Sequence, residues 1–195
     1  VLFRSANRFI VAKKVATEFT DKFAKAMAAL KVAPGLDDGA QLGASVSIKE
    51  RNKIAELVDA SVKAGGSLKI GGKVPDGEGA FYPATVIEVK KDNPILSHEV
   101  FGPVAPVVTF ETDEEGIALA NETEYGLISY VYSQDLKRAI RTAEAIEAGM
   151  VAINRGVISD PAAPFGGVKQ SGLGREGGFA GIHEFLETKY IGVEI

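Results

Sequence analysis

The chain has 195 residues, 46% of them hydrophobic, so it is long enough to bury the core of a globular domain. Its 26 acidic and 22 basic residues give a formal net charge of −4, and no lysine or arginine block is long enough to follow a phosphate backbone, which argues against a nucleic-acid partner. No apolar run reaches the roughly 18 residues of a membrane-spanning helix and the first residues do not resemble a signal peptide, so we expect a cytoplasmic protein with no membrane partner.

Two further features concern cysteine and the first residues. No cysteine is present, which excludes disulfide bonds, thiolate metal sites and a cysteine nucleophile within these residues, and we expect no metal site. The first residue is Val1 rather than methionine, and residues 1–5 run directly into a strand-like segment without a capping or start signal. We therefore expect a fragment of a longer protein.

Strand and helix signals alternate along the first half of the chain. Apolar residues spaced three and four apart predict amphipathic helices, short apolar runs predict strands, and glycine, proline and aspartate clusters predict loops. The predicted elements, in chain order, are a strand at 8–12, a helix at 15–30, a loop at 31–43, a helix around 54–62, and strands at 67–71 and 81–89.

The second half contains the clearest unit of the fold. A strand at 127–132, a helix at 136–146 that Ser133 can cap, and a strand at 150–153 predict a βαβ crossover with a parallel pair, so the fold class is α/β. Before it, residues 101–110 are apolar and β-rich, and they are interrupted by Pro103 and Pro106, which suit strand ends or edges better than a central strand. The remaining predicted elements are a capping box of Thr112 and Glu115 that opens a short helix, a short helix at 181–186 and a last strand at 188–195.

The segment from Ala163 to Gly178, APFGGVKQSGLGREGG, is dense in glycine, which is costly in backbone entropy and is retained where a backbone turns sharply or passes close to another group. The fixed pattern of Phe, Lys and Arg distinguishes it from a flexible linker, so we expect an ordered loop. Residues 172–177 fit the letters G-x-G-x-x-G but follow Lys169 and Gln170 instead of an apolar strand, so we do not expect a nucleotide-binding loop there.

Three motifs, in the order expected, resemble those of the aldehyde dehydrogenase superfamily. They are the glycine-rich segment just described, Glu-Val-Phe-Gly-Pro at 99–103, and Asn-x-Thr-x-Tyr-Gly-Leu at 121–127. The resemblance extends from about Ala6 to Ile195, and the amino-acid sequence of the glycine-rich segment most resembles that of succinate-semialdehyde dehydrogenases. It implies an open, mostly parallel twisted sheet flanked by helices, with a catalytic domain at 1–186, incomplete at its N-terminus, and an oligomerisation strand at 187–195.

The resemblance also implies a mechanism. In this family a cysteine thiolate attacks the aldehyde, hydride passes to NAD or NADP, and water cleaves the resulting thioester. Matching Ala6, Asn7 and Arg8 to the family segment that follows the cysteine places the nucleophile at Phe3, so no catalytic residue can be assigned here. The chain alone is expected to be inactive, and the departure across residues 1–5 as a block indicates truncation more readily than an evolved loss of activity.

Two residues are implied as cofactor contacts. Glu99 resembles the family glutamate that accepts hydrogen bonds from the nicotinamide ribose hydroxyls, and Phe101 would pack beside the nicotinamide ring. The alternatives are that Glu99 caps a turn and Phe101 belongs to the core. NAD and NADP cannot be distinguished, because the residues that read the adenosine 2′ position lie mostly outside this chain.

Three residues are implied as contacts of a small aldehyde substrate. Ser159 matches a serine that holds the distal carboxylate of succinate semialdehyde, and its alternative is a simple Ser-Asp-Pro turn. Arg155 departs from the branch, and its guanidinium either adds carboxylate binding or faces solvent. The resemblance implies that Phe165 packs at the mouth of the tunnel through which the aldehyde enters, and the equal alternative is that Phe165 is an ordinary core aromatic residue. Lys169 is expected to hydrogen-bond backbone carbonyls, and Arg175 to pair with Glu176 and fix the loop.

The C-terminal residues TKYIGVEI would leave an unpaired apolar edge as a strand. The family resemblance implies that this strand joins subunits into a homodimer or homotetramer in the full-length protein, and we expect the isolated chain to associate. A non-catalytic α/β module for subunit association or ligand binding is the alternative function.

Overall fold

The computed structural model describes residues 6–195, which fold into two compact units. The N-terminal unit comprises residues 6–119 and the C-terminal unit comprises residues 120–195. None of the helices in residues 6–195 is both long enough and apolar enough to cross a membrane.

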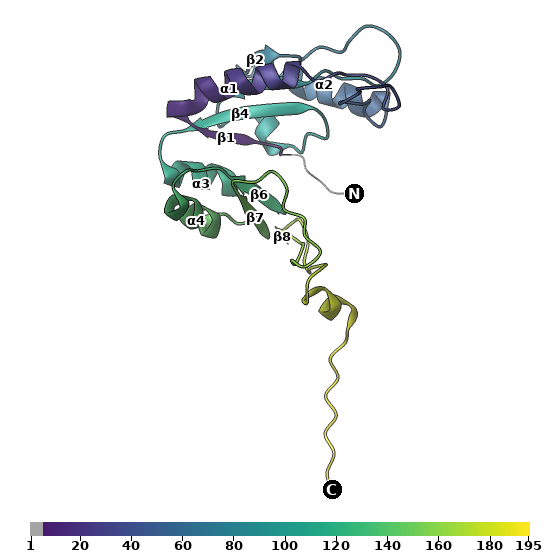
Figure 1. The fold of residues 1–195 in the computed structure, drawn as a ribbon, viewed down its shortest axis with the longest axis vertical. Coiled ribbons are helices and arrows are strands. Elements are labelled where there is room, and N and C mark those ends of the chain that lie inside the picture. The colour runs from purple at the N-terminus through teal and green to yellow at the C-terminus, as the bar shows by residue number, and fades with distance from the viewer. Residues whose placement is uncertain (1–5) are drawn as a thin grey trace. The chain divides into compact units, whose positions relative to one another are not determined.

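A four-stranded sheet in the order β1-β4-β3-β2 forms the centre of the N-terminal unit. Three of its strands, β1, β2 and β4, are labelled in Figure 1. Its strands are β1 (Phe9–Ala12), β2 (Ser67–Ile70), β3 (Thr85–Val89) and β4 (Val104–Phe110). Strands β1 and β3 run parallel to β4, and β2 runs antiparallel to β3. The predicted fold class, an α/β protein with a mostly parallel sheet flanked by helices, is therefore confirmed.

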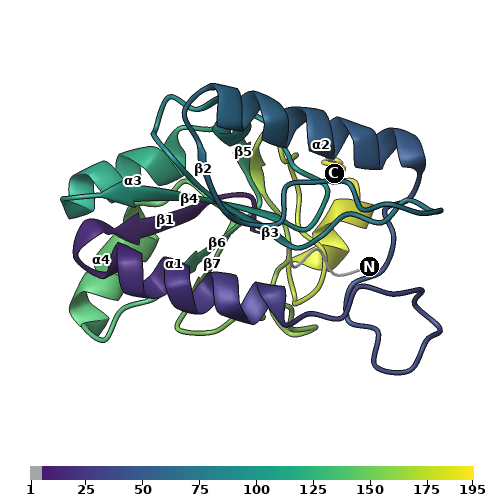
Figure 2. The ribbon, with the colours of Figure 1, turned by 90° about the horizontal axis from the view of Figure 1, so that it is seen from above.

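One helix covers each face of this sheet, and Figure 2 shows the strands between them. The helices are α1 (Lys13–Ala28) and α2 (Ile48–Lys63). Successive residues of a strand point to opposite faces, so Val86 packs with the α1 side and Ile87 with the α2 side, and both are fully buried. The α1 side also contains three phenylalanines whose tilted rings are in contact, with ring centroids 4.7 Å apart for Phe9 and Phe23 and 5.4 Å apart for Phe19 and Phe23.

A buried polar contact holds the segment that leads to β4. The 3₁₀ helix η1 (Pro94–Ser97) is capped by Asn93, whose Oδ1 accepts from the backbone N–H of Ile95 at 3.2 Å. The same side chain donates to the backbone carbonyl of Ser61 at 3.0 Å and accepts from the Ser61 hydroxyl at 2.8 Å. Because Ser61 belongs to α2, this contact fixes η1 against the helix and sets where the chain enters residues 98–103.

The C-terminal unit contains the predicted βαβ crossover. Strand β6 (Ile128–Val131), helix α4 (Leu136–Ala145) and strand β7 (Met150–Ile153) follow one another, and β6 and β7 are parallel as expected. The remaining elements are α3 (Asp113–Asn121), which spans the boundary between the units, β5 (Tyr125–Gly126), β8 (Val168–Lys169) and η2 (Gly181–Phe185). The predicted cap of α3 is confirmed, since the Thr112 hydroxyl accepts from the N–H of Glu115 at 3.2 Å.

Two local predictions are wrong. Pro106 lies inside β4, a central strand, but pairing of β4 with β1 begins only at Val107, so at Pro106 the strand is paired on the β3 side alone and a missing N–H is tolerated there. The cap of α4 is Asp135, whose carboxylate accepts from the N–H of Arg138 at 3.0 Å, while the Ser133 hydroxyl accepts from Asp135 itself.

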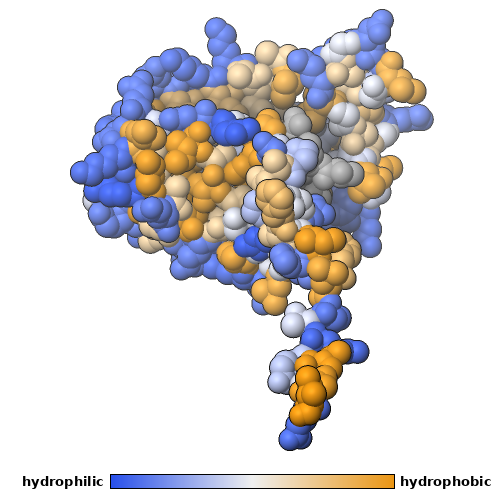
Figure 3. Space-filling view, turned by 60° about the horizontal axis from the view of Figure 1, so that its bottom comes forward, coloured by the Kyte–Doolittle hydropathy of each residue, from blue (hydrophilic) through white to orange (hydrophobic). Residues whose placement is uncertain are grey.

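Residues 187–195 form no hydrogen-bonded strand with the described part of this chain. Apolar side chains on the C-terminal segment remain exposed, as the lower end of Figure 3 shows. From η2 onward, the exposed large apolar residues are Ile182, Phe185, Leu186, Tyr190, Ile191, Val193 and Ile195. The predicted oligomerisation strand stays a prediction, because a strand that pairs with another subunit has no partner within one chain.

Candidate functional site

The two predicted cofactor contacts lie on one segment of the N-terminal unit, between η1 and β4. Burial alternates along it, with Glu99 exposed, Val100 only 3% exposed and Phe101 59% exposed. Val100 thus anchors the segment in the core on the α2 side, and its two neighbours point outward. At that exposure the Phe101 ring is not part of the core, and no hydrogen bond or ion pair joins the Glu99 carboxylate to any of residues 6–195.

Contacts from three directions hold the segment. The side-chain oxygen of Asn7 accepts from the backbone N–H of Val100 at 3.1 Å, and its amide nitrogen lies 3.5 Å from the carbonyl oxygen of His98. The N–H of Gly102 donates to the carbonyl of Val100 at 2.9 Å. A Cβ on Gly102 would lie 2.4 Å from Cδ1 of Ile54, so the backbone packs closely against this side chain of α2.

This arrangement fits a nicotinamide cofactor. A carboxylate offers two acceptor oxygens to a diol, and both oxygens of Glu99 are left for a ligand by the described residues. An exposed aromatic ring two residues away can pack against a planar ring. Residues 6–195 contain no group of three or more histidine, aspartate or glutamate side chains suited to a metal ion.

The predicted substrate contacts lie in the C-terminal unit, on the chain that follows β7. This chain starts at Asn154, which has a positive φ of 53°. Its side chain accepts from the N–H of Ser133 at 2.9 Å and donates to the carbonyl of Ser133 at 2.8 Å. The carboxamide thus ties the end of β7 to the end of β6 and fixes the direction in which the loop begins.

Arg155 and Ser159 both lie on this loop. Arg155 is exposed, and its Nε donates to the carbonyl of Val157 at 2.5 Å, so the side chain folds over its own loop. Ser159 is half-buried, and its hydroxyl makes no hydrogen bond with residues 6–195. The turn at this position is instead closed by Asp160, whose carboxylate accepts from the N–H of Ala162 at 2.9 Å.

Phe165 opens the glycine-rich segment and is half-buried. Its backbone pairs with Glu176 in both directions, with N–H to carbonyl distances of 2.7 and 2.8 Å. The two ends of the segment are therefore joined, which agrees with the expectation of an ordered loop.

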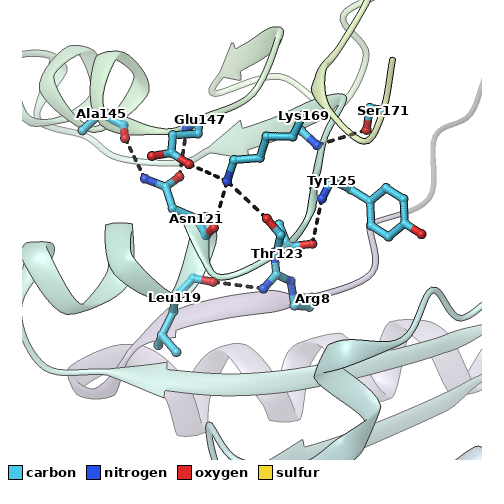
Figure 4. Close-up of polar contacts among 10 residues, drawn as sticks. Arg8, Leu119, Asn121, Thr123, Tyr125, Ala145, Glu147, Lys169 and Ser171 are labelled. Atoms are coloured by element: carbon cyan, nitrogen blue, oxygen red, sulfur yellow. Dashed lines mark hydrogen bonds and ion pairs between the residues drawn. The ribbon is translucent and has the colours of Figure 1, made fainter.

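Lys169 is the central contact of this segment (Figure 4). Its Nζ donates to the carbonyls of Asn121 at 3.0 Å and Thr123 at 3.2 Å, and it forms an ion pair with Glu147. The predicted contact of Lys169 with backbone carbonyls is confirmed. Because Asn121 is the last residue of α3, the ammonium group also lies where the helix dipole favours a cation.

The predicted charge pair of Arg175 and Glu176 is wrong. The Arg175 guanidinium donates to the carbonyls of Gly167 and Gly174, both at 2.7 Å. The lack of a side chain at Gly166 makes this possible, because a Cβ there would lie 2.7 Å from Cδ of Arg175. Arg175 therefore fixes the loop through its backbone rather than through the neighbouring carboxylate.

The five predicted contacts are thus placed on two segments. Glu99 and Phe101 share one segment of the N-terminal unit, and Arg155, Ser159 and Phe165 share one stretch of the C-terminal unit. The position expected for the nucleophile, Phe3, lies outside the described residues. Sequence patterns do not indicate the contacts of Asn7 and Asn154, which reach 93 and 21 residues along the chain.

Residues 4–191 match the aldehyde dehydrogenase family. Over 190 residues the chain is 53% identical to succinate-semialdehyde dehydrogenase of Paenarthrobacter nicotinovorans, covering 97% of this chain and 42% of that relative. It is 43% identical, also over 190 residues, to glutarate-semialdehyde dehydrogenase of Pseudomonas putida, covering 97% of this chain and 39% of that relative. The chain therefore spans about two fifths of the length of these relatives.

Solved structures agree with these sequence relatives. An NADP-dependent enzyme of E. coli has a TM-score of 0.91 at 41% identity, covering 95% of this chain and 39% of that chain. The structure of PnpE in complex with nicotinamide adenine dinucleotide has a TM-score of 0.88 at 39% identity, covering 93% of this chain and 38% of that chain.

Proposed function

Because the chain belongs to the aldehyde dehydrogenase family, we propose that it forms part of an NAD(P)-dependent enzyme that oxidises succinate semialdehyde to the carboxylic acid. The observation that carries this proposal is the 53% identity to a succinate-semialdehyde dehydrogenase over 97% of the chain. Names of similar proteins support either cofactor, since one structure is of an NADP-dependent enzyme and another holds NAD.

In this proposal, Glu99 and Phe101 are the cofactor contacts. The Glu99 carboxylate accepts hydrogen bonds from the nicotinamide ribose hydroxyls, and the exposed Phe101 ring packs beside the nicotinamide. The bound cofactor supplies the acceptor for the hydride that leaves the aldehyde carbon. The contribution of this chain is to hold the ribose from a segment that is itself fixed to the core.

Arg155, Ser159 and Phe165 are the proposed substrate contacts. A semialdehyde carries a carboxylate at its far end, and the Ser159 hydroxyl is left to donate to it because Asp160 closes the local turn. The exposed guanidinium of Arg155 adds a charge-assisted donor four residues away. Phe165 lines the approach from the start of the glycine-rich segment.

The nucleophile is the missing part of the chemistry. The sequence has no cysteine, and the matching position holds Phe3, so we propose that this chain alone does not turn over aldehyde. The same observation favours the second candidate, a non-catalytic module that keeps the fold for association or ligand binding.

A chimera separates these two candidates. It joins residues 6–195 to the N-terminal part of the Paenarthrobacter nicotinovorans enzyme, so that every group ahead of residue 6 comes from the relative. The melting temperature of the chimera is first compared with that of the Paenarthrobacter nicotinovorans enzyme, to show that the chimera is folded. The proposed function predicts that the folded chimera forms NADH or NADPH when succinate semialdehyde is added. A folded chimera that forms neither supports the non-catalytic module instead.

A second copy of the full-length protein is the proposed partner of residues 187–195. These residues are exposed and include Tyr190, Ile191 and Val193 at 92, 73 and 77% exposure. Apolar side chains left open in this way favour association, and an extended segment can add a strand to another sheet. Light scattering on the full chain and on a chain ending at Leu186 tests this, because the longer chain should associate and the shorter one should not.

A further inference from the structure

We infer that Asn7 is a positioning residue for Glu99, so that the residues just after the expected nucleophile position set the cofactor contact. This inference rests on the proposed function, in which Glu99 binds the ribose. It goes beyond that function because Asn7 is not among the proposed cofactor and substrate contacts and acts through the backbone of residues 98–100.

Local hydrogen bonds do not satisfy every backbone N–H of the segment that contains Glu99. The N–H of Gly102 and the N–H of Val104 donate two residues back, to Val100 and Gly102, at 2.9 and 2.8 Å. The N–H of Val100, immediately after Glu99, has no such local partner and is instead accepted by Oδ1 of Asn7 at 3.1 Å. This donor lies in a residue that is 3% exposed, where an unmet hydrogen bond is costly.

The geometry of Asn7 suits both sides of Glu99. Its oxygen accepts from the residue after Glu99, and its nitrogen lies 3.5 Å from the carbonyl of the residue before it, a weaker contact. Asparagine provides an acceptor and a donor on one planar group, which serine and alanine cannot do at this reach. The carboxamide therefore spans Glu99 without occupying its carboxylate.

The next residue fixes Asn7 itself. Arg8 Nη1 donates to the carbonyl of Leu119, in the last turn of α3, at 3.0 Å (Figure 4). Phe9 then begins β1 and pairs with Val107 of β4. Asn7 thus precedes Arg8, which is held by α3, and β1, which pairs with β4. The Glu99 segment leads into β4, so Asn7 and Glu99 are both connected to the same sheet. A change at Asn7 should therefore alter the position of Glu99.

The first test measures backbone protection in the 195-residue chain. Asn7→Ala should increase hydrogen exchange of the Val100 amide by about fivefold or more, since one neutral hydrogen bond is lost, and leave the β4 amide of Val107 unchanged. Asn7→Asp keeps the acceptor and should restore most of the protection. Asn52→Ala, an exposed asparagine of α2 in the same unit, is the matched control and should change neither amide.

The second test measures cofactor use in the chimera described above. Glu99→Gln should raise the KM for the cofactor by about tenfold, and Asn7→Ala by about threefold or more, with the KM for the aldehyde unchanged in both. If Glu99→Gln has no effect, the proposed role of Glu99 fails. If Glu99→Gln has its effect but Asn7→Ala changes neither the KM for the cofactor nor exchange at Val100, the inference about Asn7 is overturned and the proposed function stands.

Discussion

Replacing Gly149 by alanine should destabilise the C-terminal unit far more than the same change at Gly156. A Cβ at position 149 would lie 2.0 Å from the carbonyl oxygen of Gly166 and 2.8 Å from the Cα of Gly167. Both are backbone atoms, so no change of rotamer relieves the clash. A Cβ at position 156 would meet only the Tyr132 hydroxyl, at an ordinary 3.6 Å. Neither glycine has a positive φ, so backbone strain of that kind does not distinguish the two substitutions.

The size of the effect follows from that space. Added methyl groups in well-packed sites cost about 1–3 kcal/mol, and a clash with backbone atoms of residues 166–167 places Gly149→Ala at the upper end, at about 3 kcal/mol or more. Gly156→Ala should stay within about 0.5 kcal/mol of the parent. The clash separates the start of β7 from residues 166–167, so the destabilisation should appear first in the glycine-rich segment.

Hydrogen exchange measured by mass spectrometry resolves the two units and is the appropriate assay. Peptides covering residues 149–169 should exchange faster in Gly149→Ala than in the parent, while peptides from β4 stay unchanged. Urea unfolding of both variants gives the free energies to compare. Equal stability of the two alanine variants would refute the argument that Gly149 is required for close backbone packing.

Three further predictions concern single side chains. Burial, assisted by the charge of Asp59, raises the pKa of Tyr82 to about 12 from 10.0, and its hydroxyl has no hydrogen-bond partner within the described residues. Tyr82→Phe should therefore be neutral or stabilising at pH 7. Because the folded pKa of Tyr82 lies above the unfolded one, the parent and Tyr190→Phe, which both keep Tyr82, should each lose about 2–3 kcal/mol more than Tyr82→Phe between pH 10 and 12, measured by urea unfolding. Asn93→Ala breaks three buried hydrogen bonds and should cost about 3 kcal/mol, measured by urea unfolding; a loss below about 1 kcal/mol would show that water replaces them. Lys169→Met removes the donor shared by two carbonyls and should cost about 1–3 kcal/mol by the same measurement, whereas Lys189→Met, on the exposed C-terminal segment, should cost nothing.

Features set by neighbouring residues could be predicted from the sequence. The parallel pair of β6 and β7 followed from the spacing of two apolar runs around one helix, and the Thr112 cap of α3 followed from a four-residue pattern. The partners of Lys169 were predicted as backbone carbonyls from the glycine-rich segment that contains it, although their positions, 46 and 48 residues away, were not.

Features that depend on distant residues could not be predicted. The contact of Asn7 with Val100 crosses 93 residues and leaves no local pattern. Arg175 binds carbonyls that become accessible only because Gly166 leaves room, so its neighbour in sequence, Glu176, was the wrong partner to expect. Pro106 is tolerated in a central strand because β1 begins one position later, a matter of register that composition does not reveal.

Formation of NADH or NADPH by the chimera, followed by absorbance with succinate semialdehyde and with butanal in turn, tests the central claim most directly. Butanal has the same carbon number but no carboxylate, so it reports whether the loop with Arg155 and Ser159 binds the distal charge. The account predicts that the chimera oxidises succinate semialdehyde and that its kcat/KM for this aldehyde exceeds that for butanal by about tenfold or more, as expected for one charge-assisted hydrogen bond. A folded chimera that oxidises neither aldehyde, or both equally well, would contradict it.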